Sequence, residues 1–142
     1  MMPGLGISMS RDGKNFVIVN QVESQQWGCV EEYGPLVHVT YDEMQSNGLA
    51  IVQRSLGEYP TRKKTEKSEL EAMPTSAQKK FEREHKHVGV SLQNGSEIWI
   101  DPIHFGKRGM IGGTKPERQI LRLPTTQDTF FKALLEAFRV AD

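Results

Sequence analysis

Asp101 and His104 are the two side chains whose types and spacing best fit reaction chemistry, because only Pro102 and one further residue separate them. A carboxylate beside an imidazole can act as a general acid or base when the pair lines a cleft that holds a substrate. A small hydrolase or nuclease using Asp101 and His104 is therefore one hypothesis. The competing interpretation is structural, with Asp101 holding a turn at the end of a strand. We favour it, because no nucleophile stands in a recognisable setting.

A second group, His85 and His87 with Glu82 and Glu84, has side chains that ligate metals. Alternation along a strand would place both imidazoles on one face, which supplies two ligands. A zinc site needs three or four protein ligands in a closed geometry, and His104 is the candidate third. We expect no metal and no cofactor, and we interpret both histidines as exposed residues at the entry of a strand.

Glycines and basic residues alternate in the segment Gly106–Lys115, which raises the question of a phosphate-binding loop. The segment matches neither the P-loop pattern nor the dinucleotide-binding pattern, and no helix is expected directly after it. We predict a flexible polar loop, a kind of segment that often carries binding function.

Aromatic and acidic residues gather before the second expected strand, where Trp27 and Tyr33 flank Glu31 and Glu32. Aromatic side chains ringed by polar groups are typical of protein interfaces, although a core tryptophan beside an ordinary turn explains Trp27 equally well. We predict a contact surface for a protein partner here, with the loop after the second hairpin strand as a further part. The predicted partner-binding residues are Trp27, Glu31, Glu32, Tyr33, Asp42, Phe105, Lys107 and Arg108.

Charge is unevenly distributed, although 18 basic and 18 acidic residues cancel over the whole chain. Residues 21–58 carry six carboxylates against Arg54 alone, whereas residues 60–87 carry eight Lys or Arg against five Glu. An acidic surface speeds encounter with a basic protein, and two solvated faces are the plainer alternative. Because no strongly basic face is expected, the balance disfavours a nucleic-acid partner.

The compartment is inferred from the start of the chain and from its single cysteine. Met1–Ser10 lacks the charged flank and apolar stretch of a secretory signal, and no window approaches the length of a membrane span. Cys29 cannot form an internal disulfide, and we expect it to be a small buried hydrophobe. We therefore expect a cytoplasmic protein that does not contact membranes and is more often a monomer than a homo-oligomer.

The elements that would position these side chains begin with strands at Phe16–Val19 and Leu36–Val39. Thr40 and Glu43 have the spacing of a capping box, so a helix should begin there and run to about Leu56. Gly57 follows as the expected stop. Gly48 sits inside this helix at a cost of about 1 kcal/mol relative to Ala, which suggests that another part of the chain approaches closely.

Residues 60–74 contain a run of polar side chains with little to bury, so we predict a mobile polar loop or an exposed helical turn. No repeat or linker divides the chain. We therefore expect a single domain over residues 1–142.

The second half should open with an amphipathic segment at Ala77–Lys86 and continue into a hairpin. Its strands, Val88–Leu92 and Glu97–Asp101, each carry apolar residues on one face. A two-residue turn at Asn94-Gly95 would place these faces on opposite sides of the sheet. We therefore predict a three-residue loop, Gln93 to Gly95, that pairs Val90 with Ile98, with Gly95 in the left-handed region.

A third strand at Gln119–Leu123 is expected to be at least partly covered on both sides, because apolar residues occur on both of its faces. A final helix at Thr126–Val140 carries a broad apolar stripe in which Phe130, Leu134 and Phe138 recur every four residues. The elements together predict an α+β fold: one domain with a mainly antiparallel sheet and two principal helices packed on it.

The run Phe81–Pro102 resembles a bacterial family, the immunity proteins of contact-dependent growth inhibition systems. In that family a lysine-rich segment enters a strand, and a turn with Asn or Asp and Gly leads to an I-x-I-x-P strand. A polar loop with glycines follows, then a strand ending in I-x-I/L-P and a helix of the L…A-L-x-x-A-F kind. Here those parts are Ile98–Pro102, Ile120–Pro124 (ILRLP) and Phe131–Phe138 (FKALLEAF), and Gly48–Leu56 (GLAIVQRSL) is similar to the family's central helix.

This resemblance covers about residues 40–140. The chain departs from the family's pattern in three respects: residues 1–35 have no match, the 106–114 loop lacks a tryptophan, and the aromatic-cysteine ending is absent. It is identified as a divergent member. The implied role is non-enzymatic: binding and neutralising the toxic C-terminal domain, often a nuclease, of a cognate effector. An adaptor or structural module is the other alternative to an enzyme.

Overall fold

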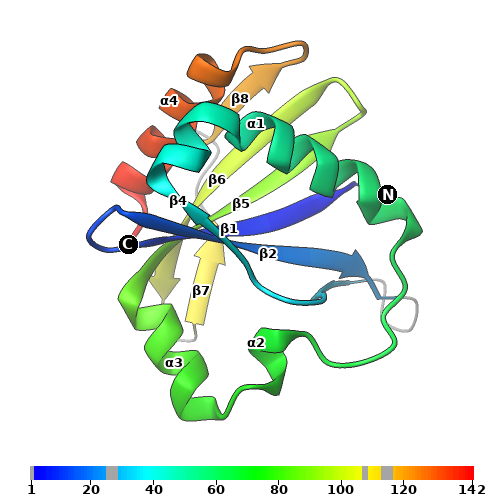
Figure 1. The fold of residues 1–142 in the computed structure, drawn as a ribbon, viewed down its shortest axis with the longest axis vertical. Helices are drawn as coiled ribbons and strands as arrows, with labels where there is room; N and C mark the ends of the chain where they lie inside the picture. Colours follow the sequence, from blue (N-terminus) through cyan, green and yellow to red (C-terminus); the bar gives the residue numbers. More distant parts are fainter. Residues whose placement is uncertain (1, 25–28, 107–108, 113–116) are drawn as a thin grey trace.

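The computed structural model describes residues 2–24, 29–106, 109–112 and 117–142 and shows one α+β domain built on an antiparallel sheet. Every strand pairing among these residues is antiparallel, as predicted. The sheet has the order β3-β2-β1-β5-β6-β7, with β4 and β8 pairing with β2 and β6 (Figure 1). Its strands are β1 (Gly4–Ser10), β2 (Asn15–Glu23), β3 (Val30–Glu32), β4 (Val37–Thr40), β5 (His85–Gln93), β6 (Glu97–Gly106), β7 (Gly109–Gly112) and β8 (Gln119–Arg122).

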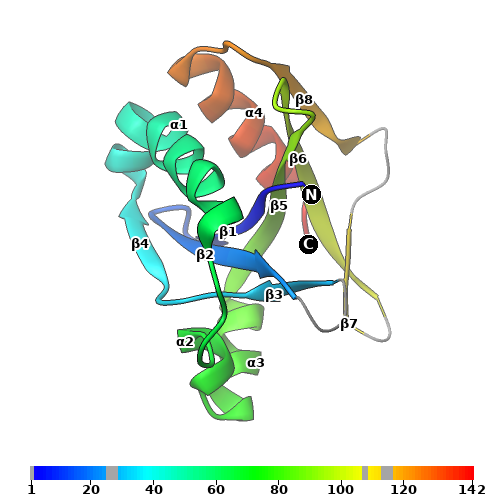
Figure 2. The same cartoon turned by 90° about the vertical axis from the view of Figure 1, so that its right-hand side faces the viewer.

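Helices lie on both faces of the sheet (Figure 2). On one face α1 (Tyr41–Glu58) and α4 (Gln127–Val140) pack together and supply most of the core. On the other face the short helix α2 (Glu69–Ala72) and the helix α3 (Thr75–Glu84) cover only part of the strands. A 3₁₀ turn, η1 (Tyr59–Thr61), follows α1 directly. No helix within the described ranges is long and apolar enough to cross a membrane.

Successive side chains of a strand point to opposite faces of the sheet, so the two faces carry different kinds of residue. Toward α1 and α4 the strands direct large apolar side chains, which are almost fully buried. Toward α2 and α3 they direct small or polar residues, apart from a minor cluster of Val17, Val19 and Leu36 with Leu70, Met73 and Phe81. The core-facing side chains of the four central strands include Leu5, Ile7, Phe16, Ile18, Val88, Val90, Ile98 and Ile100.

The first predicted helix is confirmed together with its capping box. Thr40 Oγ1 accepts from the main-chain N–H of Glu43, and the Glu43 carboxylate accepts from the main-chain N–H of Thr40, both at 3.2 Å. The expected stop at Gly57 is wrong, because the helix runs on to Glu58 and continues into η1, where Tyr59 is buried. The last predicted helix is also confirmed, with Thr126 as its N-cap.

The hairpin between β5 and β6 confirms that the apolar faces align, but its register differs from the prediction. Gln93 pairs with Glu97 and Val90 pairs with Ile100, so the three-residue loop is Asn94 to Ser96. Asn94 and Gly95 both have positive φ, 51° and 68°. Two consecutive left-handed residues move the turn one position along the chain, and the pairing of apolar faces is preserved.

Three other expectations are corrected. β8 is not covered on both sides, since Ile120 is 49% exposed while Leu121 is buried. The 106–115 segment contains the strand β7, paired with β6 over Ile103–Gly106. Asp101 does not end a strand in a turn, because β6 runs through Asp101-Pro102 to Gly106.

Three strands, β1, β3 and β7, were not predicted. β1 alternates Leu5, Ile7 and Met9 with Gly6 and Ser8, a pattern that the residue types contain but that glycine and serine weaken. It pairs with β2 and β5 on its two sides, so it is the central strand of the sheet.

Glycine at position 48 has a steric reason. A Cβ atom there would lie 2.6 Å from Met44 Sδ and 3.4 Å from Phe130 Cε1, where α1 meets α4. The awkward mid-helix glycine therefore lets the two principal helices approach closely.

Two glycine-to-alanine substitutions in α1 should have opposite effects on the free energy of unfolding. Gly57→Ala meets nothing within 4 Å and should raise it by about 1 kcal/mol through helix propensity. Gly48→Ala should lower it by about 1 kcal/mol, because overpacking at a buried contact costs about 1–3 kcal/mol and exceeds the propensity gain. Urea denaturation of the two variants checks this. Equal stabilisation by both would contradict the packing role of Gly48.

Candidate partner-binding surface

Residues 62–68, which we call the strap, cross from η1 to α2 and lie beside β2 and β3. Arg62 anchors its start, with a side chain only 5% exposed. Its guanidinium donates to Gln21 O at 2.9 Å and to Ser55 O and Oγ at 2.8 Å. It also lies 5.6 Å from the centre of the Tyr33 ring. Arg62 thus joins β2, α1 and the residue after β3.

Lys64 and Glu69 hold the strap along β3 and the turn that follows it. Lys64 Nζ donates to the main-chain oxygen of Glu32 at 2.7 Å and also binds the Glu71 carboxylate. Glu69 N–H donates to Gly34 O at 3.0 Å, and the Glu69 carboxylate accepts from Leu36 N–H at 3.2 Å. The edge of β3 is therefore partly capped by side chains of the chain itself, which limits pairing with another strand.

These contacts qualify the prediction of a mobile polar loop at 60–74. The segment contains the short helix α2, whose N-cap Ser68 forms a complete capping box with Glu71 and is buried. Its polar side chains bind main-chain groups of neighbouring strands, which is why the segment needs few apolar residues to be placed. Its mobility stays a prediction.

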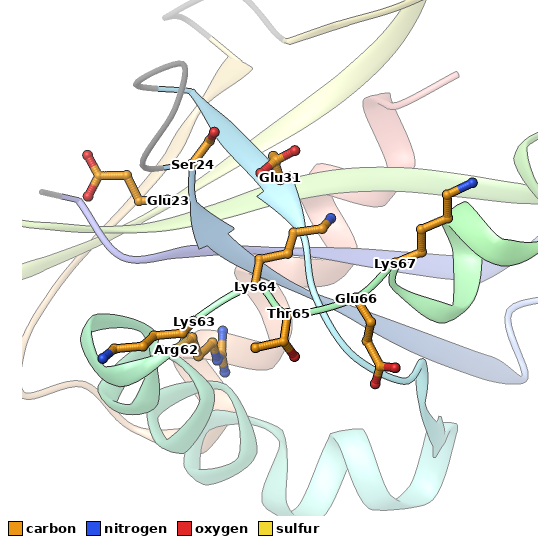
Figure 3. A pocket seen from close by; sticks show the side chains of 9 residues that line it. All are labelled: Glu23, Ser24, Glu31, Arg62, Lys63, Lys64, Thr65, Glu66 and Lys67. Carbon is orange, nitrogen blue, oxygen red and sulfur yellow. The ribbon is translucent and has the colours of Figure 1, made fainter.

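A cleft of about 610 Å³ lies between the strap and the end of the β2–β3 pair (Figure 3). Glu23 and Glu31 line one side, and strap residues line the other. The acidic and basic segments expected from the sequence therefore lie on opposite sides of one cleft. Its lining residues are Glu23, Ser24, Glu31, Arg62, Lys63, Lys64, Thr65, Glu66 and Lys67.

The predicted partner-binding residues do not form one surface. Glu31, Glu32 and Tyr33 stay together, on β3 and directly after it, and all three are half-buried. Asp42 is exposed in the first turn of α1, near Asn15 at the opposite end of β2. Phe105 lies on β6 and packs edge-on against His87, with ring centres 6.0 Å apart. Trp27, Lys107 and Arg108 lie outside the described residues.

Glu31 and Glu32 point to different environments because they are neighbours on one strand. Glu31 lines the cleft, whereas Glu32 faces α2, where burial and the nearby Glu71 carboxylate raise its pKa. Cys29 is exposed, which corrects the expectation of a buried thiol. Val30, next to it, is 53% exposed. The start of β3 therefore offers a small apolar surface beside the cleft.

Asp101 and His104 do not form the pair that an acid–base site would need. An odd separation along β6 places them on opposite faces of the sheet. Asp101 accepts from Arg118 Nε at 2.6 Å, and the Arg118 guanidinium lies 4.0 Å from the Trp99 ring centre. His104 instead lies between Glu117, with Nε2 3.0 Å from Oε1, and Asp142, with Nδ1 3.2 Å from Oδ1. Both carboxylates raise the pKa of the His104 imidazole.

His85 and His87 share a strand face, as predicted, but both rings are engaged in structural contacts. His87 is buried, where desolvation lowers its pKa. Its Nε2–H donates to Glu82 O at 3.0 Å, so Nδ1 accepts from the Ser8 hydroxyl at 2.8 Å. His85 stacks on Phe81 with ring centres 4.2 Å apart. Among the described residues no group of three or more His, Cys, Asp or Glu is arranged to hold a metal ion.

Sequence reasoning missed the groups that build the cleft, namely Glu23, Arg62 and Lys64. Arg62 and Lys64 belong to a basic run interspersed with Glu, which has the composition of a solvated surface. The available signal was the negative charge of residues 21–58, opposite to the positive charge of residues 60–87. This signal is compatible with a basic partner protein and equally with contact between the two segments of this chain.

Comparisons with known proteins place the fold but not the function. No family model matches the chain, and no curated protein matches it. Among solved structures it is similar to a protein of unknown function from Neisseria meningitidis, with 12% sequence identity and a TM-score of 0.64. The alignment covers 100% of this chain and 96% of that protein. The whole α+β fold therefore has a counterpart among solved structures.

Arg62→Met should lower the free energy of unfolding by about 3 kcal/mol, because it leaves buried carbonyl oxygens of β2 and α1 without their donor. The matched control is Lys63→Met, since Lys63 is exposed and its change should stay within about 0.5 kcal/mol. Urea denaturation measures both. Similar small effects would show that the strap is not anchored through Arg62.

His104→Gln should destabilise the protein more at about pH 5.5 than at about pH 9. A raised folded-state pKa means that the stabilisation is present below the unfolded value of 6.5 and is lost as pH rises through the folded value. Denaturation of both proteins at the two pH values gives the difference. A gap that is unchanged or wider at about pH 9 would contradict the charge pairing at His104.

Proposed function

We propose that this protein is an immunity protein that binds and neutralises the C-terminal toxin domain of a cognate contact-dependent growth inhibition effector, in the cytoplasm. The observation that carries the proposal is the resemblance of Phe81–Pro102, Ile120–Pro124 and Phe131–Phe138 to that family. The observed order of β5, β6, β8 and α4 agrees with the family's strand, turn, strand, loop, strand and helix, and the short strand β7 lies where the family pattern has the loop. This agreement supports the proposal without identifying the toxin.

The start of β3 and the side of the cleft that carries Glu23 and Glu31 form the surface that best suits a basic protein partner. Glu23 and Glu31 present carboxylates beside the exposed Val30, which combines charge for encounter with apolar area for contact. Basic partners are the expected case because nuclease toxins bind a polyanionic substrate. A tight complex would use a few anchors and complementary charge more than total area.

Growth protection tests the function directly. Cells that express the toxin domain of an exported effector encoded beside this gene should grow when they also express this protein, and should arrest when they do not. A toxin domain from an unrelated effector is the specificity control. Arrest in both cases, with the protein shown to be soluble and folded, would refute the immunity role.

Charge reversal at the cleft should slow association with a basic toxin domain. Glu31→Lys should lower the association rate constant about tenfold at low ionic strength, and the effect should shrink as salt screens it. Glu69→Lys is unsuitable as a control because the Glu69 carboxylate accepts from Leu36 N–H. Glu97→Lys is suitable because Glu97 lies on β6, several strands away from β3 in the sheet order. Stopped-flow or surface plasmon resonance measures the rates. Equal slowing by Glu31→Lys and Glu97→Lys would exclude a local role for Glu31.

A further inference from the structure

A cavity of about 190 Å³ lies on the second face of the sheet, between the strands and helices α2 and α3. It shares none of its lining residues with the cleft beneath the strap. Gly6 and Ser8 of β1 form part of its floor, and Val19, Leu70 and Phe81 are among its apolar walls. A cavity of about 150 Å³ can hold benzene, so this one has room for a large side chain.

Among the described residues, those that line this cavity with a charged side chain are both acidic. They are Glu32 and Glu82, and the described lining includes neither Lys nor Arg. The imidazole of His87 is the other titratable group, and burial lowers its pKa, which favours the neutral form. The neutral ring donates from Nε2 to Glu82 O and accepts at Nδ1 from the Ser8 hydroxyl. At neutral pH the described lining of the cavity therefore has carboxylates and no cation.

Glu32 is only partly compensated by its neighbours. Lys64 and a hydrogen bond from the Ser68 hydroxyl lower the pKa of Glu32, but the Lys64 ammonium binds the Glu71 carboxylate and the main-chain oxygen of Glu32. Burial and the Glu71 carboxylate outweigh both and raise the pKa of Glu32. Glu82 differs, because it also lines a neighbouring pocket with Arg11, Lys79 and Arg83. Within the described part of the chain, no ion pair joins Glu32 to a cation.

Ionised Glu32 costs the folded state stability at neutral pH. A carboxyl group whose folded-state pKa is raised binds its proton more tightly when folded, so deprotonation above the unfolded pKa favours unfolding. Binding sites often contain groups that lower the free energy of unfolding of the unbound protein. An incoming cation would remove this cost.

We infer that the cavity receives one arginine side chain of the bound toxin domain, with its guanidinium at Glu32 and its stem along Phe81. This rests on the proposed function. β3 carries Glu31 toward the cleft and Glu32 toward the cavity, so one partner approaching this edge can reach both.

Arginine fits the lining better than lysine does. A guanidinium has five N–H donors in a plane and needs several acceptors, whereas an ammonium is a compact point charge. Besides Glu32, the lining offers the amide oxygen of Gln78, whose amide nitrogen is already used by Glu71 O and Met73 O, at 3.3 and 2.8 Å. Phe81 supplies an apolar ring, along which the aliphatic stem of an arginine can pack.

The first experiment needs no toxin. Nα-acetyl-arginine amide is titrated into ¹⁵N-labelled protein, with the acetyl amides of citrulline and lysine as uncharged and ammonium probes. The arginine probe should shift the amide signals of Gly6, Ser8 and Phe81 saturably. The citrulline probe should bind at least tenfold more weakly, and this difference measures the contribution of charge. Absence of saturable shifts, or equal binding of citrulline, would overturn the inference.

Two variants separate charge from space in the same titration. Glu32→Gln keeps the shape, should fold with unchanged or higher stability, and should weaken arginine binding at least tenfold. Gly6→Leu should fill part of the cavity from its floor without removing a carboxylate, since a Cβ there meets nothing closer than 3.7 Å. Glu31→Gln, facing the cleft, is the matched control and should bind the probe like wild type.

The second experiment uses the toxin domain. Glu32→Gln and Gly6→Leu should both weaken its binding at least tenfold, mainly through faster dissociation, because they act on a desolvated contact. If wild type binds the toxin and both variants bind it equally well, the arginine anchor is refuted while the immunity role stands. If the probe binds but no toxin does, the immunity role fails, and a toxin arginine as occupant fails with it.

Discussion

The difference between the two faces of one sheet determines how the rest of this molecule is arranged. Strands β1, β2, β5 and β6 bury Leu5, Phe16, Val90 and Ile100 against α1 and α4, where Gly48 lets the helices meet closely. The opposite face carries glycine, serine and glutamine, which cannot support a second full apolar layer. Only a small cluster under α2 and α3 forms there. The polar strap and a cavity occupy the remaining space, so stability resides on one face and the opportunities for binding on the other.

Hydrogen bonds to main-chain groups replace apolar packing on the second face. Arg62 and Lys64 hold the strap by donating to carbonyl oxygens of β2, α1 and β3. Such contacts order a segment that has little to bury, since each buried donor or acceptor left unmatched would be costly. The positive charges of Arg62 and Lys64 are therefore engaged in contacts within the molecule. What remains for a partner is the acidic side of the cleft and the carboxylate of Glu32.

Local patterns were sufficient to predict the fold class, both principal helices and the strands β2, β4, β5, β6 and β8, because capping and apolar periodicity depend on neighbouring residues. The hairpin register was missed by one loop position, since two left-handed residues at Asn94 and Gly95 outweighed the simple pairing rule. β1 was missed because glycine and serine occupy its outer face. The separation of Asp101 from His104 depended on β6 continuing through Pro102, and the pairing of strap and β3 depended on contacts between distant residues. Neither is visible in local sequence.

We propose that this protein inhibits its toxin stoichiometrically and makes and breaks no covalent bond. The most direct test is a titration of purified toxin domain, at a concentration far above the dissociation constant, with toxin activity measured after each addition of this protein. We expect toxin activity to fall linearly and to reach zero at one molecule of this protein per toxin domain. Inactivation by much less than one equivalent would indicate turnover, and full activity at excess would indicate no inhibition. Either result would contradict it.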